Sequence, residues 1–317
     1  MEKKRLGNSD MDITRIGLGA WAIGGSWRWG WGHQDEKDSI RTIHKALDSG
    51  INWIDTAPAY GLGTSEKVIG KALKERNDKP YIFTKCGILW DNKGKAWQEI
   101  SRKTILKEID ESLTRLGVDV IDLYQIHWPN PDKNIEEAWE TLAEIKEQGK
   151  VRYIGVSNFS VEQLKRAEKI APITSLQPPY SILRRDIEKE ILPHCQEKNI
   201  GVIVYSPMAS GLLTGKVTEE WVASLPDDDW RKQADDFRQP RLARNLALVE
   251  ILRDIAKKHN STIAETAIAW TLKHPAVTAA IVGMRRPDQV DGVTGAPGVQ
   301  LDNEDLERIE TFIKQNP

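Results

Sequence analysis

Short apolar runs alternate with longer segments of helical periodicity along most of this chain. Eight of the runs have the length and the Ile, Val and Leu content of buried β-strands. Between them, apolar residues recur every three or four positions, as at Ile40, Ile43 and Leu47, which is typical of amphipathic helices. The predicted strands are Ile16–Gly19, Asn52–Asp55, Tyr81–Lys85, Ile121–His127, Tyr153–Ser157, Ser175–Gln177, Val202–Ser206 and Ala279–Val282.

The regular alternation of strands and helices predicts the fold class. Ser160 with Gln163, and Thr262 with Glu265, have the spacing of capping boxes that open helices. Strands that alternate with helices imply parallel pairing through right-handed crossovers. Eight such units predict an α/β protein, a (β/α)8 TIM barrel formed by one domain over residues 1–317.

An open, doubly wound sheet is the alternative fold. It requires a glycine-rich turn directly after an early strand and an acid at a set distance on a second strand. The best candidate for that turn, Gly17–Gly25, lacks the glycine spacing, and no such acid follows it. We therefore favour the closed barrel.

Two regions lie outside the eight units. Residues 1–15 carry a Gly-Asn-Ser-Asp turn between short polar segments, which predicts a hairpin that covers the bottom of the barrel. Residues Thr214–Leu242 form a long insertion of mixed charge after the seventh strand. Loops of that length in compact domains are usually functional or disordered. The insertion is therefore either a lid over the catalytic end or a mobile charged loop.

The composition is that of an ordinary globular protein. The 317 residues are 39% hydrophobic and 29% charged, with a formal net charge of −2, so we expect no nucleic acid and no membrane surface as partner. Two cysteines make neither a disulfide framework nor a metal site and fit a reducing compartment. Without a signal peptide or a spanning segment in the sequence, we expect a cytoplasmic protein that binds no metal.

Ionisable side chains stand at the ends of three successive predicted strands. Asp55, Lys85 and His127 end the second, third and fourth strands, and Tyr60 lies in the loop after the second. The carboxyl ends of barrel strands meet at one face, so these four side chains are expected to converge there. Reduction of a carbonyl requires a proton donor and a hydride donor. Since no side chain donates hydride, a nicotinamide cofactor is required.

Each of the four groups has a role that its chemistry permits. Tyr60 is the predicted proton donor, and the ammonium of Lys85 is expected to make its phenol a stronger acid. Asp55 would pair with Lys85 and keep it protonated. His127 would donate a hydrogen bond to the substrate carbonyl and stabilise the developing alkoxide. Taken singly, an Asp at a strand end is as often a cap, and a His there is more often a packing residue.

A resemblance strengthens this interpretation. The sequence is similar to the aldo-keto reductase family over nearly its whole length, and most closely to a bacterial branch typified by a Bacillus general stress protein. The family implies a monomeric barrel that uses NADP(H) to reduce aldehydes and ketones, with Asp55, Tyr60, Lys85 and His127 as a catalytic tetrad. The matching motifs are Asp55-Thr-Ala-Pro-Ala-Tyr60-Gly, Ser65-Glu66-Lys-Val-Ile-Gly70, Thr84-Lys85, Asp122-Leu-Tyr-Gln-Ile-His127-Trp, Gly149-Lys-Val-Arg-Tyr-Ile-Gly-Val-Ser-Asn-Phe159, Gln177-Pro, Tyr205-Ser-Pro and Gly211-Leu-Leu-Thr-Gly-Lys216.

The resemblance also implies where the cofactor lies. Ser157, Asn158 and Gln177 resemble the residues that hold the nicotinamide carboxamide, and Tyr205 resembles the aromatic that stacks under the ring. Ala20 and Trp21 match positions near the catalytic end and are included among the cofactor contacts, as is Asp55. The expected pyrophosphate loop, whose backbone N–H groups could serve the phosphates, comprises Ser206, Pro207, Met208, Ser210, Gly211 and Leu212.

The segment after the eighth strand predicts an anion site by itself. A strand end, a glycine and two arginines before a helix that begins at Pro287 can hold a phosphate. The same segment resembles the 2′-phosphate site of the family, which favours NADP(H) over NAD(H). Asp291-Gly-Val293 stands where many members have an Asn that contacts adenine, so that contact can be missing. The predicted contacts are Gly283, Met284, Arg285 for the 2′-phosphate, and Gln289 near the adenine.

Tryptophans are abundant, with 12 in the chain, and several follow predicted strand ends. They could form an apolar wall over the nicotinamide, which predicts aromatic or otherwise apolar carbonyl substrates. Packing against the barrel rim is the alternative for some of them. The predicted pocket residues are Trp21, Trp27, Trp29, Trp31, Trp90 and Trp128.

Two other functions stay open at this point. One is a cofactor-binding regulatory subunit, like the potassium-channel β relatives of the family. The other is an aldolase that forms a Schiff base on Lys85, although that reading gives no purpose to Tyr205, Arg285 or the Ser157-Asn158 pair. The NADPH-dependent carbonyl reductase is the function we favour.

Overall fold

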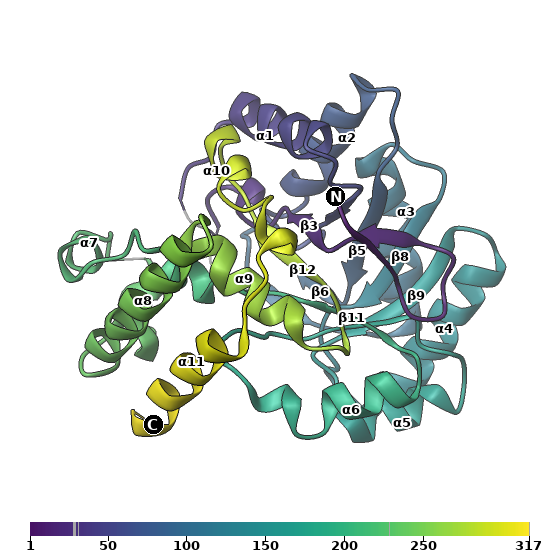
Figure 1. Ribbon diagram of the computed structural model, residues 1–317. Helices are drawn as coiled ribbons and strands as arrows, with labels where there is room; N and C mark the ends of the chain where they lie inside the picture. The colour runs from purple at the N-terminus through teal and green to yellow at the C-terminus, as the bar shows by residue number, and fades with distance from the viewer. Residues whose placement is uncertain (28–29, 31, 228, 317) are drawn as a thin grey trace.

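Eight parallel strands close into a barrel in the computed structural model, which describes residues 1–27, 30, 32–227 and 229–316. Helices surround the barrel (Figure 1), so the prediction of a (β/α)8 fold is confirmed. In order around the barrel, the strands are β10 (Ser175–Gln177), β11 (Gly201–Val204), β12 (Val277–Gly283), β3 (Ile16–Gly19), β4 (Trp53–Asp55), β5 (Tyr81–Cys86), β8 (Ile121–Ile126) and β9 (Val151–Ser157).

Each of the eight predicted apolar runs corresponds to one barrel strand, with ends that differ by a few residues at most. The helices between them follow the predicted periodicity, and both predicted capping boxes are present. The α-helices are α1 (Glu36–Asp48), α2 (Thr64–Lys74), α3 (Arg102–Leu116), α4 (Ile135–Glu147), α5 (Val161–Glu168), α6 (Ile191–Glu197), α7 (Glu219–Ala223), α8 (Arg241–Lys258), α9 (Ile263–Lys273), α10 (Pro287–Asp291) and α11 (Asn303–Gln315). The 3₁₀ helices are η1 (Ala22–Gly24), η2 (Asp132–Asn134), η3 (Asp186–Glu188), η4 (Ala209–Thr214), η5 (Trp230–Gln233), η6 (Asp235–Phe237) and η7 (Ala296–Gly298).

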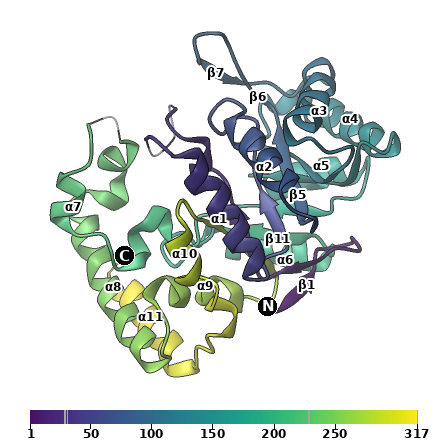
Figure 2. The ribbon, with the colours of Figure 1, turned by 90° about the horizontal axis from the view of Figure 1, so that it is seen from above.

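Two antiparallel hairpins are added to the barrel. Strands β1 (Lys3–Arg5) and β2 (Asp12–Thr14) form the predicted N-terminal hairpin. Its buried side chains pack in one cluster with Trp53 and Phe83 from the barrel interior, so the hairpin closes the end at which the strands begin. The second hairpin, β6 (Ile88–Trp90) with β7 (Ala96–Gln98), was not predicted. It stands out from the barrel near α2 and α3 (Figure 2).

The insertion after the seventh strand is folded. Residues 214–242 contain α7, η5 and η6, and a small apolar cluster that includes Val217, Val222 and Phe237 holds them together. Both ribbon views place α7 at the periphery beside α8 (Figures 1 and 2). In the same insertion, Trp230 makes an edge contact with Trp21, with ring centroids 6.4 Å apart. The insertion therefore reaches the loop that follows the first barrel strand.

The barrel interior has an apolar lower layer and a polar upper layer. Alternate residues of a strand point inward, so residues two positions apart on one strand occupy successive layers. Trp53, Phe83 and Leu123 are fully buried and belong to one apolar cluster near the N-terminal ends of their strands. The residues two positions further along the same strands are Asp55, Lys85 and Gln125, all of which are buried.

Two glycines leave room for side chains of neighbouring strands. A Cβ atom on Gly17 would lie 2.2 Å from the indole ring of Trp53, and one on Gly155 would lie 2.3 Å from Oγ of Ser175. The first distance is too short for any side chain, so glycine at position 17 is required for Trp53 to fill the barrel.

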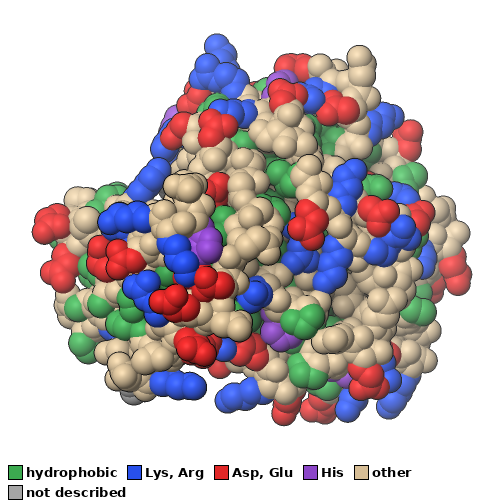
Figure 3. Space-filling model, in the orientation of Figure 1, with side chains coloured by type: hydrophobic (Ala, Val, Ile, Leu, Met, Phe, Trp, Pro, Cys, Tyr) green, Lys and Arg blue, Asp and Glu red, His purple; other side chains and the backbone are tan. Residues whose placement is uncertain are grey.

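The surface has no dominant charge on the face that Figure 3 presents. Acidic and basic side chains are interspersed there, in line with the formal net charge of −2. In the described part of the chain, no helix has both the length and the apolar character needed to cross a membrane.

A buried ion pair joins two helices behind β5. Glu66 of α2 is fully buried, accepts a hydrogen bond from the hydroxyl of Thr84 (2.7 Å) and pairs with Nε of Arg115 on α3 (2.6 Å). Loss of one partner of a buried pair leaves an uncompensated charge, which is far more costly than loss of an exposed pair.

Replacement of Arg115 should therefore destabilise the fold strongly. We expect Arg115→Met to lower the free energy of unfolding in urea by about 3–5 kcal/mol, because the carboxylate of Glu66 stays buried without its cation. The matched control is Arg253→Met, which breaks the exposed pair of Arg253 with Glu250 (3.0 Å) and should cost less than about 1 kcal/mol. Equal losses for the two variants would contradict this assignment.

Candidate active site

The four side chains predicted to converge are neighbours at the C-terminal end of the barrel. Nζ of Lys85 lies 2.7 Å from Oδ1 of Asp55 and 3.3 Å from the hydroxyl oxygen of Tyr60. The rings of Tyr60 and His127 meet edge to face, with centroids 5.8 Å apart. β4 positions Asp55, β5 positions Lys85, and Tyr60 and His127 lie in the connections that follow β4 and β8.

The ammonium of Lys85 is fully buried, and each of its three N–H groups has an acceptor. Besides Asp55 and Tyr60, it donates to the carbonyl oxygen of Thr56 at 2.8 Å. Burial lowers the pKa of Lys85, and the adjacent carboxylate of Asp55 opposes that shift. Three acceptors, one of them an anion, match a protonated amine with three donors. Sequence reasoning missed the Thr56 carbonyl, because a backbone acceptor has no signature in residue type.

The pKa of Tyr60 moves in the direction opposite to the one expected. Burial raises it well above the ordinary value of a phenol, and the negative charge of Asp55 adds to the rise. The expected lowering by Lys85 is not seen, since the carboxylate beside that ammonium offsets its field. The phenol oxygen accepts the hydrogen bond from Lys85, so its own proton is directed elsewhere.

His127 is held in the neutral form. Its pKa is well below the ordinary value because burial penalises the imidazolium, and the positive charge of Lys85 adds to that penalty. Within the described residues, no hydrogen bond involves either nitrogen of its ring, whereas its backbone N–H donates to the carbonyl of Cys86 at 3.0 Å. A neutral imidazole has one N–H donor, which leaves a donor beside Tyr60.

The second carboxylate oxygen of Asp55 is bound by two glutamines. Nε2 of Gln177 donates to Oδ2 at 2.8 Å, and Nε2 of Gln125 lies 3.5 Å from the same oxygen. Gln177 was predicted as a cofactor contact. Gln125 was missed, although it stands two residues before His127 in a strand, a spacing that places it inside the barrel.

The residues predicted to hold the nicotinamide form one hydrogen-bonded group. The hydroxyl of Ser157 donates to the carbonyl of Gln177 (2.8 Å), and Nδ2 of Asn158 donates to the carbonyl of His127 (3.0 Å). The hydroxyl of Tyr205 donates to Oδ1 of Asn158 (2.9 Å), and burial raises the pKa of Tyr205 to about 12. The ends of β8, β9, β10 and β11 are thereby linked to one another.

The segment after β11 has an unusual backbone conformation. Ser206, Ala209, Ser210 and Gly211 all have positive φ angles, between 46° and 94°. The N–H groups of Ala209 and Gly211 donate within the loop, to the carbonyls of Ser206 (3.0 Å) and Met208 (3.1 Å). Of the other residues predicted for this loop, Pro207 and Leu212 are buried and Met208 is partly buried. Across the site, the backbone N–H of Ala20 donates to the carbonyl of Asp55 at 2.9 Å.

Arg285 is half-buried and held by neutral acceptors. Its guanidinium donates to Oε1 of Gln34 (2.9 Å) and to the carbonyl of His33 (2.8 Å), which belong to the loop after β3. Burial lowers its pKa, and the nearby cations Arg231 and Arg286 lower it further. In the described part of the chain no carboxylate pairs with Arg285, so this cluster of arginines keeps an excess of positive charge.

Gln289 has a structural role at the start of α10. Its Oε1 accepts hydrogen bonds from the backbone N–H groups of Arg285 (2.7 Å) and Arg286 (3.2 Å). This use leaves only its amide nitrogen for another partner. Of the neighbouring predicted contacts, Gly283 is exposed and Met284 is fully buried.

The predicted tryptophans do not share one environment. Trp21 and Trp27 are partly buried, Trp128 is 38% exposed, and Trp29 and Trp31 lie outside the described residues. Trp97 of the β6–β7 hairpin, which was not predicted, is also exposed. The hairpin is tied to the loop after β8 through a hydrogen bond from Asn130 to Gln98 (2.7 Å).

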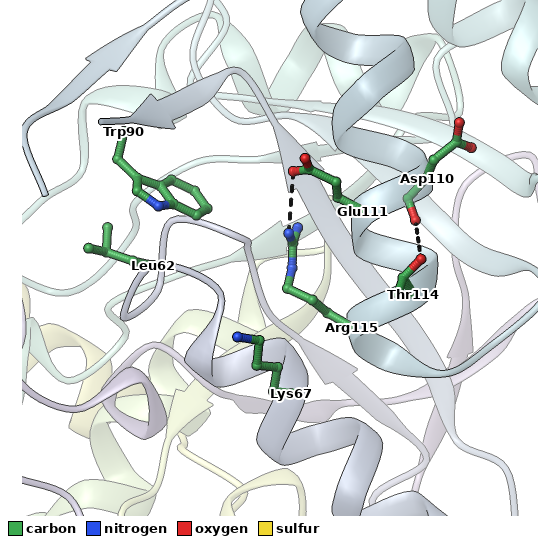
Figure 4. A pocket seen from close by; sticks show the side chains of 7 residues that line it. All are labelled: Leu62, Lys67, Trp90, Asp110, Glu111, Thr114 and Arg115. Atoms are coloured by element: carbon green, nitrogen blue, oxygen red, sulfur yellow. Dashed lines mark hydrogen bonds and ion pairs between the residues drawn. The ribbon is translucent and has the colours of Figure 1, made fainter. Parts of the chain in front are cut away.

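Trp90 lines a surface hollow of about 450 Å³ between β6, α2 and α3. Figure 4 shows its indole beside Leu62, across from Lys67 and the side chains of α3. The charged residues of this hollow lie on the outer side of the barrel wall. Trp90, which belongs to the hairpin, thus shares this hollow with Leu62 from the loop that carries Tyr60. The other lining residues are Asp110, Glu111, Thr114 and Arg115.

One group of side chains outside this site has the composition of a metal site. His259, Asp302 and Asp305 offer ligand atoms within 4.8 Å of one another. The ammonium of Lys258, however, lies 2.7 Å from Asp302 and 2.9 Å from Asp305, and both carboxylates cap the start of α11. The ammonium of Lys258 therefore supplies the positive charge beside Asp302 and Asp305 that a metal ion would otherwise provide.

Comparison with known proteins agrees with the resemblance. Residues 15–314 match a family model described as "Aldo/keto reductase family". The chain is 40% identical to the aldo-keto reductase YhdN of Bacillus subtilis (strain 168), over 99% of this chain and 94% of that protein. It is 35% identical to the NADH-specific methylglyoxal reductase of Escherichia coli (strain K12), over 96% of both chains.

A solved structure is also very similar. The glycerol dehydrogenase AKR11B4 from Gluconobacter oxydans matches with a TM-score of 0.92 and 38% sequence identity, over 100% of this chain and 97% of that one.

The burial of His127 predicts that its imidazole stays neutral where an exposed histidine titrates. In NMR spectra, its ring signals, assigned by their loss in His127→Asn, should not move between about pH 8 and about pH 6. Below about pH 6.5 the unfolded chain binds a proton at this residue that the folded chain does not, so this histidine lowers the free energy of unfolding as the pH falls. A midpoint near 6.5 for those signals would contradict the assignment.

Proposed function

This chain belongs to the aldo/keto reductase family and is an oxidoreductase, and we propose that it reduces aldehydes and ketones with hydride from NADPH and a proton from Tyr60. The contact between Lys85 and Tyr60, 3.3 Å long and backed by the ion pair with Asp55, is the observation that carries the proposal. NADPH, when bound, supplies the hydride.

The proton is transferred from the phenol to the developing alkoxide. Because the Tyr60 oxygen already accepts a hydrogen bond from Lys85, its O–H is free to point at a substrate oxygen. The same ammonium stabilises the phenolate that remains after transfer. The neutral ring of His127 donates a second hydrogen bond to the substrate oxygen and stabilises its growing negative charge.

The same contacts weigh against a Schiff-base aldolase. A nucleophilic lysine must be deprotonated and able to reach a carbonyl carbon. Lys85 is fully buried, and its three N–H groups are occupied by Asp55, Thr56 and Tyr60. These features support a fixed ammonium over a nucleophile.

The chain offers groups that fit each part of the cofactor. Ser157, Asn158 and Gln177 would hold the carboxamide, and the ring of Tyr205 would stack on the nicotinamide. Backbone N–H groups of Ser206–Leu212 would bind the pyrophosphate, apart from those of Ala209 and Gly211, which donate within the loop, and Pro207, which has none. Ala20, Trp21, Met284 and Gln289 are proposed as further contacts.

We favour NADPH over NADH because of Arg285. A guanidinium held only by neutral acceptors, beside Arg231 and Arg286, has the charge and the donors to bind a 2′-phosphate. One relative with 35% identity is named as NADH-specific, so the preference has to be measured for this chain.

The proposed substrates are carbonyl compounds with an apolar or aromatic group. Trp21, Trp27 and Trp128 would form part of the pocket, and Trp90, which lines the outer hollow, is proposed as a further member. The names of two similar proteins refer to glycerol and to methylglyoxal, so a test panel should include small polar carbonyls beside aromatic aldehydes. The monomeric state and the cytoplasmic location stay predictions.

Removal of the phenol hydroxyl should abolish reduction without loss of cofactor binding. Tyr60→Phe is expected to lower kcat by about 10²-fold or more, because the step loses its general acid. NADPH binding, followed by fluorescence, should stay within about twofold. The control is Tyr81→Phe, which should leave kcat unchanged. Tyr81 begins β5, whereas Lys85, the partner of Tyr60, lies near the other end of that strand. Turnover of Tyr60→Phe within tenfold of the parent would remove Tyr60 from this role.

Cofactor choice should depend on Arg285. Arg285→Ala is expected to raise the Kd of NADPH about tenfold or more, because the 2′-phosphate loses a charge-assisted hydrogen bond, and to change the Kd of NADH by less than about threefold. Arg286→Ala, which removes the adjacent arginine that pairs with Asp288 (3.1 Å), is the matched control and should have a smaller effect. Equal weakening of both cofactors by Arg285→Ala would exclude Arg285 from the 2′-phosphate site.

A further inference from the structure

A second glutamine lies beneath the proposed active site. Gln125 of β8 is fully buried, and its side chain makes polar contact only with Asp55 and Gln177 among the described residues. Its Nε2 lies 3.5 Å from Oδ2 of Asp55, and its Oε1 lies 3.4 Å from Nε2 of Gln177. The amide therefore connects the proposed catalytic carboxylate to a proposed cofactor contact.

The orientation of the Gln177 amide follows from these neighbours. An ionised carboxylate only accepts hydrogen bonds, so the Gln177 atom 2.8 Å from Oδ2 of Asp55 must be the NH₂ group. Oε1 of Gln125 accepts from the same NH₂ group and favours the same orientation. In the described residues no hydrogen bond is donated to Oε1 of Gln177, so this oxygen is the free end of the amide.

The interior of the barrel packs closely around Gln125. A Cβ atom on Gly155 of the neighbouring strand would lie at an ordinary contact distance, 3.4 Å, from its Cγ. One layer below, the corresponding residue of β8 is the apolar Leu123, which packs in the interior cluster. An apolar residue at position 125 would fill the barrel equally well, but it would provide neither the acceptor for Gln177 nor the donor for Asp55.

We propose that Gln125 is a positioning residue, which fixes the amide of Gln177 so that its oxygen, and not its nitrogen, is presented to the carboxamide of the cofactor. The inference rests on the proposed function, in which Gln177 contacts that carboxamide. Without Gln125, the bond to Asp55 is the remaining anchor of the Gln177 amide, so its orientation is held less firmly. The acceptor for the NH₂ group of the carboxamide is then less well positioned.

The test compares two cofactors that differ at that group. The 3-acetylpyridine analogue of NADP⁺ keeps the carbonyl on the ring and has a methyl group in place of the amide NH₂. We expect the parent protein to bind NADP⁺ about five- to tenfold more tightly than the analogue, which is the value of one hydrogen bond. In Gln125→Met the ratio of the two Kd values, measured from quenching of tryptophan fluorescence, should fall by about twofold or more.

Three variants make the result specific. Gln177→Ala should also reduce the ratio to about one, while Leu123→Met, a buried change one layer below on the same strand, should leave it at the parent value. Gln125→Glu keeps an acceptor for Gln177 and should keep the ratio. In its protonated form it also donates to Asp55, so its kcat relative to the parent should rise as the pH falls.

The possible outcomes separate this inference from the proposed function. If the parent and Leu123→Met discriminate, Gln177→Ala does not, and Gln125→Met does so as well as the parent, the positioning role is wrong and the proposed function stands. If the parent binds neither cofactor, or Gln177→Ala discriminates as well as the parent, the cofactor contacts are wrong and the inference falls with them. Should Gln125→Met fail to fold, a Gln125→Glu variant that loses discrimination would overturn the role by itself.

Discussion

The ion pair between Asp55 and Lys85 is the constraint to which the rest of the site is adapted. Two opposite charges inside a barrel lose their hydration, and their mutual attraction offsets that loss only when the remaining donors and acceptors also find partners. Oδ1 of Asp55 receives the ammonium at 2.7 Å, and Oδ2 receives the amide of Gln177 at 2.8 Å. The other two N–H groups of Lys85 bind Thr56 and Tyr60. Two of the groups that satisfy the pair, Tyr60 and Gln177, are thus also groups that we propose to contact the substrate and the cofactor.

The geometry of a parallel barrel supplies this arrangement with few residues. Side chains two positions apart on a strand lie in successive layers, so one step along each strand leads from Trp53, Phe83 and Leu123 to the polar layer above them. The apolar layer and the N-terminal hairpin exclude water from below. At the end where the strands finish, Tyr60 and His127 are partly exposed, and this is where we propose that a cofactor and a substrate enter.

Much of this could be predicted from the sequence, because the relevant signals are local. Apolar runs and capping boxes give the eight strands and several helices, and polar residues at strand ends indicate Asp55, Lys85 and His127. The β6–β7 hairpin was missed because each of its strands has only three residues, and two of the three in β7 are exposed. Gln125 and the Thr56 carbonyl were missed for another reason. Their importance depends on which atoms face them across the barrel, and periodicity alone does not identify those atoms.

The pKa of Tyr60 is raised, whereas the sequence predicted that it would be lowered. Tyr60 remains the proposed acid, but the way in which it holds and releases its proton has to be described differently. A phenol made more acidic by a cation would lose part of its proton to solvent at neutral pH, whereas burial keeps this one fully protonated. Transfer of the proton is still favourable, because an alkoxide formed from a carbonyl is a far stronger base than a phenolate. In the reaction we propose, Lys85 acts on the phenolate after transfer, when the negative charge has moved to the oxygen 3.3 Å from its Nζ. Burial would therefore hold the proton on Tyr60 before reaction, and the ammonium would stabilise the phenolate that remains.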